Sequence, residues 1–252
     1  PFARVKKLKP DRTVAPEGRY VHDQKAVNSS GTKFDHPPAL QPPHKAVAKE
    51  VLYLQAIWPK VQVLLSKNDV KSAFRLIWLA LSDVGIFVTE VPGAAFGVEE
   101  TIVQFFLCLS FGFLGSPDEY QIFVQVAKQF HEARKPVNWY FNGSYSSELF
   151  LVDDQVLVAS CLGTRPWDPS DCAVAGIQNT FGPDSVNNSK ADEEAAWTTS
   201  KIVWGLIMDT IARECSLPEA KTSKQLSSSR NPSSIQVSLS SIQPSRMSIQ
   251  PF

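Results

Sequence analysis

Two adjacent carboxylates, Asp153 and Asp154, lie in the middle of an apolar stretch, residues 148–159, that is rich in β-branched side chains. Its two arms predict strands and the carboxylates predict the turn between them, although this turn contains no Gly, Pro or Asn. Because successive strand residues point to opposite faces, the two carboxylates cannot both enter one apolar core. They repel each other and are costly to desolvate unless a cation lies between them. The pair indicates either a cation site or, as is usual for charged residues, a solvated turn.

A third carboxylate, Asp69, ends a second apolar stretch, residues 61–69, which predicts a buried strand. An aspartate at the exit of a strand, followed by a turn, is where α/β and α+β folds hold active-site carboxylates. The same residue type is an ordinary N-cap for a helix that follows. The residues alone leave both roles open.

The elements around these carboxylates are predicted from the spacing of apolar and turn-forming residues. Residues 1–28 predict a basic β-hairpin with its turn at residues 16–18. Residues 45–58 predict a helix that ends at Pro59. Further strands are predicted at residues 86–91, 102–109 and 202–208. The second of these is so apolar that we expect it at the centre of a sheet.

A Gly-containing loop at residues 110–117 leads into another predicted helix, with Pro117 in its first turn. We expect the apolar face of this helix to consist of Tyr120, Phe123, Val124, Ala127 and Phe130. Between the hairpin of the paired carboxylates and residue 200 we expect a polar, acidic connection. Residues 222–252 are dominated by Ser, Gln, Ile and Pro and are expected to be disordered.

Composition is that of an ordinary globular chain, with 252 residues of which 43% are hydrophobic and 20% charged. The longest apolar run, residues 101–115, is too short and interrupted for a membrane span, which needs about 20 residues, so we expect no membrane partner. The four cysteines are widely spaced and predict reduced thiols in an intracellular protein. The first residue is Pro1 and the start is basic and polar, so we expect a fragment or a processed piece without a signal peptide.

Charge is distributed unevenly along this chain of zero net charge. Residues 1–49 carry a net charge of +6, residues 50–200 a net charge of −9, and residues 201–252 a net charge of +3. A basic arm beside an acidic body suits a protein that grips an anionic polymer with one part and a divalent metal with another. Chance scatter of charge is the alternative.

Five motifs, in order along the chain, resemble those of the reverse transcriptases of retroelements. They are RYVHDQKAVN at 19–28, KNDVKSAF at 67–74, LSFGFLGSP at 109–117, LVDD at 151–154 and IVWGL at 202–206. They look like the family's fingers motif, first carboxylate motif, LPFGLxSP motif, [YF]xDD motif and primer-gripping strand. Ser110 replaces a frequent Pro and Leu151 a frequent Tyr or Phe. The resemblance covers about residues 4–221.

This resemblance implies a two-metal nucleotidyl transfer from a deoxynucleoside triphosphate to a primer 3′-hydroxyl on an RNA or DNA template. It implies that Asp69 and Asp153 ligate two Mg²⁺ or Mn²⁺ ions, that the Val70 carbonyl adds one ligand, and that Asp154 supports the primer-side ion. Hard cations of this kind prefer carboxylate oxygens. Lys190 is an open candidate for the acid that protonates the pyrophosphate.

The same resemblance implies a nucleotide site in which Arg19 packs against the incoming nucleotide and Lys25 occupies a position where the family usually has Arg. Phe74 would be the ring that excludes a ribose 2′-hydroxyl, or else a core residue. Phe111 and Gly112 would line the floor of the nucleotide pocket. Lys9 or Arg12 could reach the γ-phosphate.

The implied fold is α+β, a polymerase palm with an antiparallel sheet packed on helices, plus a β-rich fingers subdomain and a disordered C-terminal tail. The implied division is a fingers part at 1–60, a palm at 61–221 and the tail at 222–252. Within the palm we expect a fingers insertion at about 78–105 and the primer-gripping strand at about 201–208. No thumb or RNase H segment is recognised, so we expect weak or absent activity from this chain alone, since phosphate contacts dominate affinity.

Two other functions are compatible with parts of this pattern. A catalytically inactive retroelement remnant, with only a nucleic-acid-binding or interaction role, would have the same fold. A two-carboxylate hydrolase would need a histidine near the paired carboxylates, and the four histidines (His22, His36, His44, His131) show no such spacing.

Overall fold

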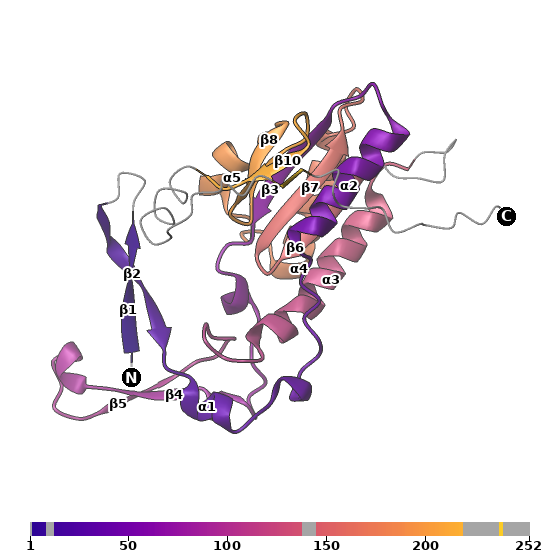
Figure 1. Ribbon diagram of the computed structural model, residues 1–252. Coiled ribbons are helices and arrows are strands. Elements are labelled where there is room, and N and C mark those ends of the chain that lie inside the picture. Colours follow the sequence, from indigo (N-terminus) through magenta and orange to yellow (C-terminus); the bar gives the residue numbers. More distant parts are fainter. Residues whose placement is uncertain (1, 9–12, 138–144, 219–236, 239–252) are drawn as a thin grey trace. The chain divides into compact units, whose positions relative to one another are not determined.

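The computed structural model describes residues 2–8, 13–137, 145–218 and 237–238. Its elements form two compact units, one made of residues 1–40 and 72–123 and the other of residues 41–71 and 124–252. The boundary between them falls inside one helix, α3 (Ser116–Arg134). The described part is a mixed α+β structure whose named strands all pair antiparallel (Figure 1). The expected α+β class is therefore confirmed.

The second unit is built on a three-stranded sheet of β3 (Val63–Asp69), β7 (Asp154–Ser160) and β6 (Ser146–Leu151), in the order β3-β7-β6. The central strand β7 is buried from its second residue onward. A strand buried on both faces shows a continuous apolar run in place of alternation, as its Val156 to Ala159 do. The strands predicted around Asp69 and around the paired carboxylates are confirmed.

One face of this sheet is covered by α2 (His44–Ile57), the helix expected before Pro59. Its buried residues Val47, Val51 and Leu54 recur at helical spacing and form one stripe. The stripe packs in one cluster with Val63 and Leu65 of β3 and with further residues of the sheet. This cluster is the main apolar core of the second unit, and it extends to Val203 and Met208.

The other face of the sheet carries a buried polar layer. Asn68 donates to Gln155 Oε1 at 2.6 Å, and Gln155 donates to Glu148. Glu148 Oε2 in turn lies 2.8 Å from His131 Nδ1 of α3, and both side chains are fully buried. The hydrogen bonds from Asn68 to Gln155 and from Gln155 to Glu148 join β3, β7 and β6, which favours a single strand register, and the contact of Glu148 with His131 adds α3.

Two helices lie in the segment that was expected to be a polar, acidic connection, so that expectation is wrong. They are α4 (Trp167–Phe181) and α5 (Asn188–Glu194). The buried residues Ala173, Gly176 and Ile177 give α4 an apolar face at helical spacing. At Gly176 a Cβ would lie 2.7 Å from the Ala127 carbonyl oxygen, so glycine permits the close approach of α4 to α3.

The single strand expected at about 201–208 is also wrong, because the chain reverses in its middle. The structure has β8 (Ser200–Val203) and β9 (Leu206–Asp209), joined at Trp204 and Gly205, whose φ angles are 46° and 88°. Two successive residues with positive φ make the two-residue hairpin turn whose twist matches the strands. The strand β10 (Glu214–Ser216) pairs with β9, and β11 (Val237–Ser238) pairs with β10.

The segment after α4 covers the outer edge of β3. Val186 forms an antiparallel bridge with Val70, and Thr198 forms another with Leu65. The Ser66 hydroxyl donates to the Ala195 carbonyl oxygen at 2.7 Å. On this side of β3 the Leu65 amide and carbonyl and the Asp69 carbonyl therefore have partners within the second unit.

The first unit begins with a hairpin of β1 (Phe2–Leu8) and β2 (Val14–His22). The hairpin is confirmed, but its turn is not at residues 16–18, which lie within β2. The register shifts between Lys6, the partner of Gly18, and Leu8, the partner of Val14. Pro16 lies in this irregular part of the ladder, where the loss of a backbone donor is tolerated.

A second two-stranded sheet in the first unit consists of β4 (Val88–Val91) and β5 (Ile102–Phe105). The expected position of residues 102–109 at the centre of a sheet is wrong: among the described strands β5 pairs with β4 alone, and Val103 and Phe105 are about half exposed. None of the four residues of β5 is buried, as the residues of a central strand would be.

The remaining elements of the first unit are short. They are α1 (Lys25–Ser29) and the 3-10 helices Lys33–Asp35, Ala73–Leu76, Val84–Ile86 and Gly93–Phe96. The expected start of α3 near Pro117 is confirmed, and its residues Tyr120, Val124 and Ala127 are buried as expected.

Two further observations concern the cysteines and the helices of the described residues. The four cysteines, Cys108, Cys161, Cys172 and Cys215, are free thiols. None of the helices within the described ranges is long and apolar enough to cross a membrane. The expected disordered tail at 222–252 lies outside the described residues, apart from Val237–Ser238 in β11.

Replacement of Leu65 by Ala tests the core between α2 and the sheet. Leu65 has no exposed surface and packs in the main cluster, so Leu65→Ala should lower the free energy of unfolding by about 2–5 kcal/mol. Urea unfolding followed by circular dichroism measures this loss. The matched change Leu81→Ala, at a side chain that is 90% exposed, should cost less than about 0.5 kcal/mol.

Candidate active site

Three carboxylate-bearing residues meet where β3 ends and β7 begins. Asp69, the last residue of β3, is the register partner of Asp154, the first residue of β7. One residue further, the Val70 amide donates to the Asp153 carbonyl oxygen at 3.0 Å. Antiparallel pairing therefore places the backbones of residues 85 and 83 positions apart in the sequence directly opposite one another.

The turn between β6 and β7 consists of Val152 and Asp153 and has strained geometry. Val152 has a φ of 56°, which is rare for a β-branched residue. Its amide donates to Gln41 Oε1 at 3.0 Å, a bond that holds the turn from outside the hairpin. Strain of this kind costs on the order of 1–3 kcal/mol and is concentrated at functional sites.

The Asp69 side chain is buried and both of its oxygens have partners from the segment after α4. Lys190 Nζ donates to Oδ1 at 2.7 Å, and Asn187 Nδ2 donates to Oδ2 at 2.7 Å. The Asn187 amide also donates to the Asp69 carbonyl oxygen at 3.0 Å. The carboxylate is held by one cation and one neutral amide.

A second ion pair joins the same two elements. Lys67 Nζ lies 2.9 Å from Glu194 Oε2. Lys67 precedes Asp69 by two residues on β3, and Glu194 follows Lys190 by four residues on α5. Lys201 Nζ donates to the Glu194 carbonyl oxygen at 2.6 Å. Alternate residues of a strand and residues four apart on a helix each share one face, so α5 is joined to β3 at two points.

Burial and mutual repulsion disturb the ionisation of the paired carboxyls. The pKa of Asp153 is raised chiefly by burial, and the charges of Asp154 and Asp69 raise it further. The pKa of Asp154 is likewise raised chiefly by burial, while the Lys67 charge lowers it. Burial lowers the pKa of Lys190, but the hydrogen bond to Asp69 and the negative charges of Asp69, Glu194 and Asp154 together outweigh it, so the net shift is upward. The site concentrates negative charge that a cation would relieve.

Within the described part of the chain, no three His, Cys, Asp or Glu side chains are grouped so that they could hold a metal ion. Both oxygens of Asp69 are turned to Lys190 and Asn187. The donor chemistry nevertheless fits a hard divalent cation, because Asp69, Asp153 and Asp154 supply carboxylate oxygens. One of these carboxylates, that of Asp69, already binds a cationic group, the Lys190 ammonium.

Trp204, at the tip of the β8–β9 hairpin, contacts the carboxylate hairpin. Its indole Nε1 donates to the Asp154 carbonyl oxygen at 3.3 Å. The His44 ring packs edge-on against the indole with ring centroids 5.7 Å apart. Through Trp204 the motif IVWGL is brought to the backbone of the carboxylate pair.

The expected nucleotide-site residues lie in the first unit, and the structure joins some of them. Asn28 Nδ2 donates to the Gly112 carbonyl oxygen, and Asn28 Oδ1 accepts from the Leu114 amide, each at 2.8 Å. The fingers motif and the LSFGFLGSP loop therefore meet. Phe74 is buried, with its ring centroid 5.0 Å from that of Phe111 and 5.4 Å from that of Tyr120.

The other expected residues of the first unit are less informative. Arg19 lies in β2, opposite Val5, and Lys25 is exposed at the start of α1. Lys9 and Arg12 lie outside the described residues.

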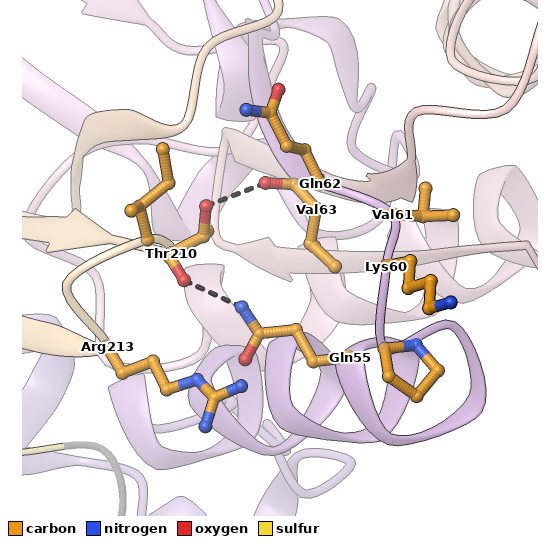
Figure 2. A pocket seen from close by; sticks show the side chains of 9 residues that line it. Gln55, Lys60, Val61, Gln62, Val63, Thr210 and Arg213 are labelled. Atoms are coloured by element: carbon orange, nitrogen blue, oxygen red, sulfur yellow. Dashed lines mark hydrogen bonds between the residues drawn. The ribbon is translucent and has the colours of Figure 1, made fainter.

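A separate pocket of about 200 Å³ lies in the second unit at the opposite end of β3 from Asp69. Figure 2 shows it between the end of α2 and the turn after β9. There Gln55 Nε2 donates to the Thr210 carbonyl oxygen at 2.6 Å, and Thr210 Oγ1 donates to the Val63 carbonyl oxygen at 2.7 Å. These bonds fix the start of the strand that carries Asp69.

Comparison with known proteins identifies no relative: no family model matches the chain, and a search of curated proteins finds no match.

Sequence reasoning missed several polar residues around Asp69, above all Asn187, Glu194 and Lys67. A signal for them exists in the charge pattern. Lys67 and Asp69 alternate on a predicted strand, and Lys190 and Glu194 are four apart, so the two pairs have complementary charges at spacings that fit one strand and one helix. The helix α5 had to be recognised before this match could be seen.

The raised pKa values predict how Asp153→Asn changes stability. A carboxyl whose pKa is higher in the folded state stabilises the fold when protonated, and this contribution is lost as pH rises through the folded pKa. Asp153→Asn should therefore raise the melting temperature near neutral pH, and the gain should shrink as pH falls toward about 4.

Calorimetry between about pH 4 and pH 8 measures this pH dependence. Asp171→Asn, at an exposed position on α4, is the control and should show no such growth with pH. A gain for Asp153→Asn that is constant across the range would contradict the electrostatic origin.

Proposed function

We propose that this chain is the fingers and palm portion of an RNA-directed DNA polymerase, a reverse transcriptase of a retroelement. The observation that supports this most strongly is the register of β3 with β7, in which Asp69 is opposite Asp154 and Val70 bonds to Asp153. The proposal rests on the motif resemblance together with this meeting of its two carboxylate motifs. In this proposal β3, β7 and β6 form the palm sheet.

In this function Asp69 and Asp153 would hold two Mg²⁺ or Mn²⁺ ions with the Val70 carbonyl, and Asp154 would support the primer-side ion. Such ions activate the primer 3′-hydroxyl and neutralise the triphosphate charge. The chain itself would supply a fixed strand-end geometry. Gln41 and Trp204 hold the carboxylate hairpin by its backbone, so the positions of the carboxylates do not depend on their own side-chain contacts.

The further motifs support the same proposal. The β8–β9 hairpin with Trp204 at its tip is the expected primer-gripping element, and its bond to Asp154 links the primer end to the carboxylates. The contacts of Asn28 with the LSFGFLGSP loop join two motifs that the resemblance assigns to the nucleotide site. The net charge of +6 in residues 1–49 suits a phosphate backbone or a triphosphate.

Primer extension tests this proposal. The purified protein, alone and fused to a retroelement thumb domain, is given oligo-dT on poly-rA with deoxythymidine triphosphate and Mg²⁺ or Mn²⁺. We expect primer extension by the fused protein, and its loss to background in Asp153→Asn, because one carboxylate ligand of both ions becomes a neutral amide.

The matched control is Asp171→Asn, the same change at an exposed position on α4, which should leave extension intact. Extension that survives Asp153→Asn would show that the metal site is wrongly assigned. Binding of primer–template without extension by any variant would favour the inactive-remnant function.

The choice of sugar is tested at Phe74, which follows Asp69 by five residues and is assigned the exclusion of a ribose 2′-hydroxyl. Phe74→Ala should increase incorporation of ribonucleotides relative to deoxyribonucleotides in the same assay. Because Phe74 is buried, the change also destabilises the fold, by about 3–5 kcal/mol. Phe87→Ala, at another buried ring of this unit, controls for that loss and should leave sugar choice unchanged.

A further inference from the structure

Lys190 is bound to the carboxylate on which the proposed metal site depends. Its Nζ lies 2.7 Å from Asp69 Oδ1, and its side chain is 46% exposed whereas that of Asp69 is 8% exposed. A largely buried carboxylate without a counter-ion is unfavourable, so the ammonium stabilises Asp69 in this arrangement. The lysine reaches this position from the solvent side.

The two partners of Asp69 differ in what they permit. A carboxylate offers about four lone-pair sites, so the neutral amide of Asn187 on Oδ2 leaves room for a metal ligand bond. The Lys190 ammonium on Oδ1 carries a positive charge and has no lone pair to offer a metal. A divalent cation bound to the Asp69 carboxylate would strongly repel the Lys190 ammonium, which lies 2.7 Å from the same carboxylate.

The docking of α5 does not depend on the bond from Lys190. Glu194 pairs with Lys67 at 2.9 Å, and its carbonyl accepts from Lys201 at 2.6 Å. The Ser66 hydroxyl donates to the Ala195 carbonyl at 2.7 Å, directly after the helix. The Lys190 side chain can therefore leave Asp69 while α5 remains on β3.

We propose that Lys190 is a built-in counter-ion that competes with the divalent cation for Asp69, and that metal binding displaces its ammonium into solvent. This inference rests on the proposed function, because it requires a metal at Asp69. In the structure both oxygens of Asp69 are engaged, Oδ1 by Lys190 and Oδ2 by Asn187. No covalent step is involved.

Competition predicts that removal of the lysine charge tightens metal binding. Mn²⁺ binding is measured by electron paramagnetic resonance of the free ion in wild type, Lys190→Met, Lys190→Arg and Lys71→Met. Lys190→Met should lower the Mn²⁺ dissociation constant by about tenfold or more, because the repulsion of a like charge beside the site is removed. Lys190→Arg keeps the charge and should bind Mn²⁺ about as weakly as wild type.

Lys71→Met is the matched control, because Lys71 is an exposed lysine two residues after Asp69 and its replacement removes the same unit of charge. It should change the dissociation constant by less than about threefold, because solvent screens an exposed charge. An equal effect of both methionine variants would overturn the proposal and leave only a general charge effect. Unchanged or weaker binding in Lys190→Met would overturn it as well.

A direct readout follows the lysine itself. Reductive methylation of the protein, quantified at Lys190 and Lys71 by mass spectrometry, reports how accessible each amine is. Addition of Mg²⁺ should increase methylation of Lys190 relative to Lys71, and Asp153→Asn should weaken this increase. An unchanged ratio in protein that binds Mn²⁺ would overturn the displacement.

The two proposals fail in different ways. Absence of Mn²⁺ binding in wild type and in Lys190→Met would overturn both, since no metal site would then exist at Asp69. Binding that is lost in Asp153→Asn but is not tightened by Lys190→Met would leave the proposed metal site standing and overturn only the counter-ion.

Discussion

The register of β3 with β7 is the constraint on which the rest of this structure depends. A slip of one residue would move every side chain of β3 to the opposite face and separate Asp69 from Asp154. Two different kinds of contact prevent it. Apolar residues of α2 pack on one face, and on the other Asn68, Gln155 and Glu148 require specific polar partners.

The two faces of the sheet contribute differently to stability and to strand register. Apolar packing supplies most of the free energy but tolerates substitution and small shifts. A buried polar layer contributes little net stability and is costly when its partners are mismatched. The layer that ends at His131 therefore specifies register more than it adds stability. Correct register in turn is what brings the backbones of Asp69, Asp153 and Asp154 together.

The carboxylate turn adopts a backbone conformation and a degree of side-chain burial that its residue types disfavour. Val152 has a positive φ, and Asp153 and Asp154 have raised pKa values because they are partly buried beside each other and beside Asp69. Each feature destabilises the folded chain, and Gln41, Trp204 and α2 compensate from outside the hairpin. Backbone strain and buried charge that are concentrated in one turn and stabilised by neighbouring elements are typical of functional sites.

Sequence patterns predicted the elements whose apolar residues are long and regular. The helix α2, the strand β3 and the β6–β7 hairpin were predicted because burial on one stripe or in one continuous run leaves a clear period. The carboxylate positions at strand ends followed from them. The α+β class was predicted as well, through a family resemblance.

Elements that depend on single backbone angles or on polar contacts were not predictable in this way. Trp204 and Gly205 split a run that reads as one apolar strand, because the reversal needs two positive φ angles and no change of composition. The helix α5 is short and polar, and the charge pattern of its ion pairs to β3 has no meaning until the helix itself is recognised. The centre position expected for residues 102–109 failed because hydrophobicity alone does not say how many neighbours a strand has.

The bridges of Val186 and Thr198 to β3 have a consequence for the behaviour of the chain in solution. An uncovered strand edge is a template to which another chain can add a strand, and this is a common route to aggregation. On its outer side β3 is instead covered by its own chain, in the same segment that supplies Asn187 and Lys190 to Asp69. The stretch from 185 to 198 thereby protects this strand edge against self-association.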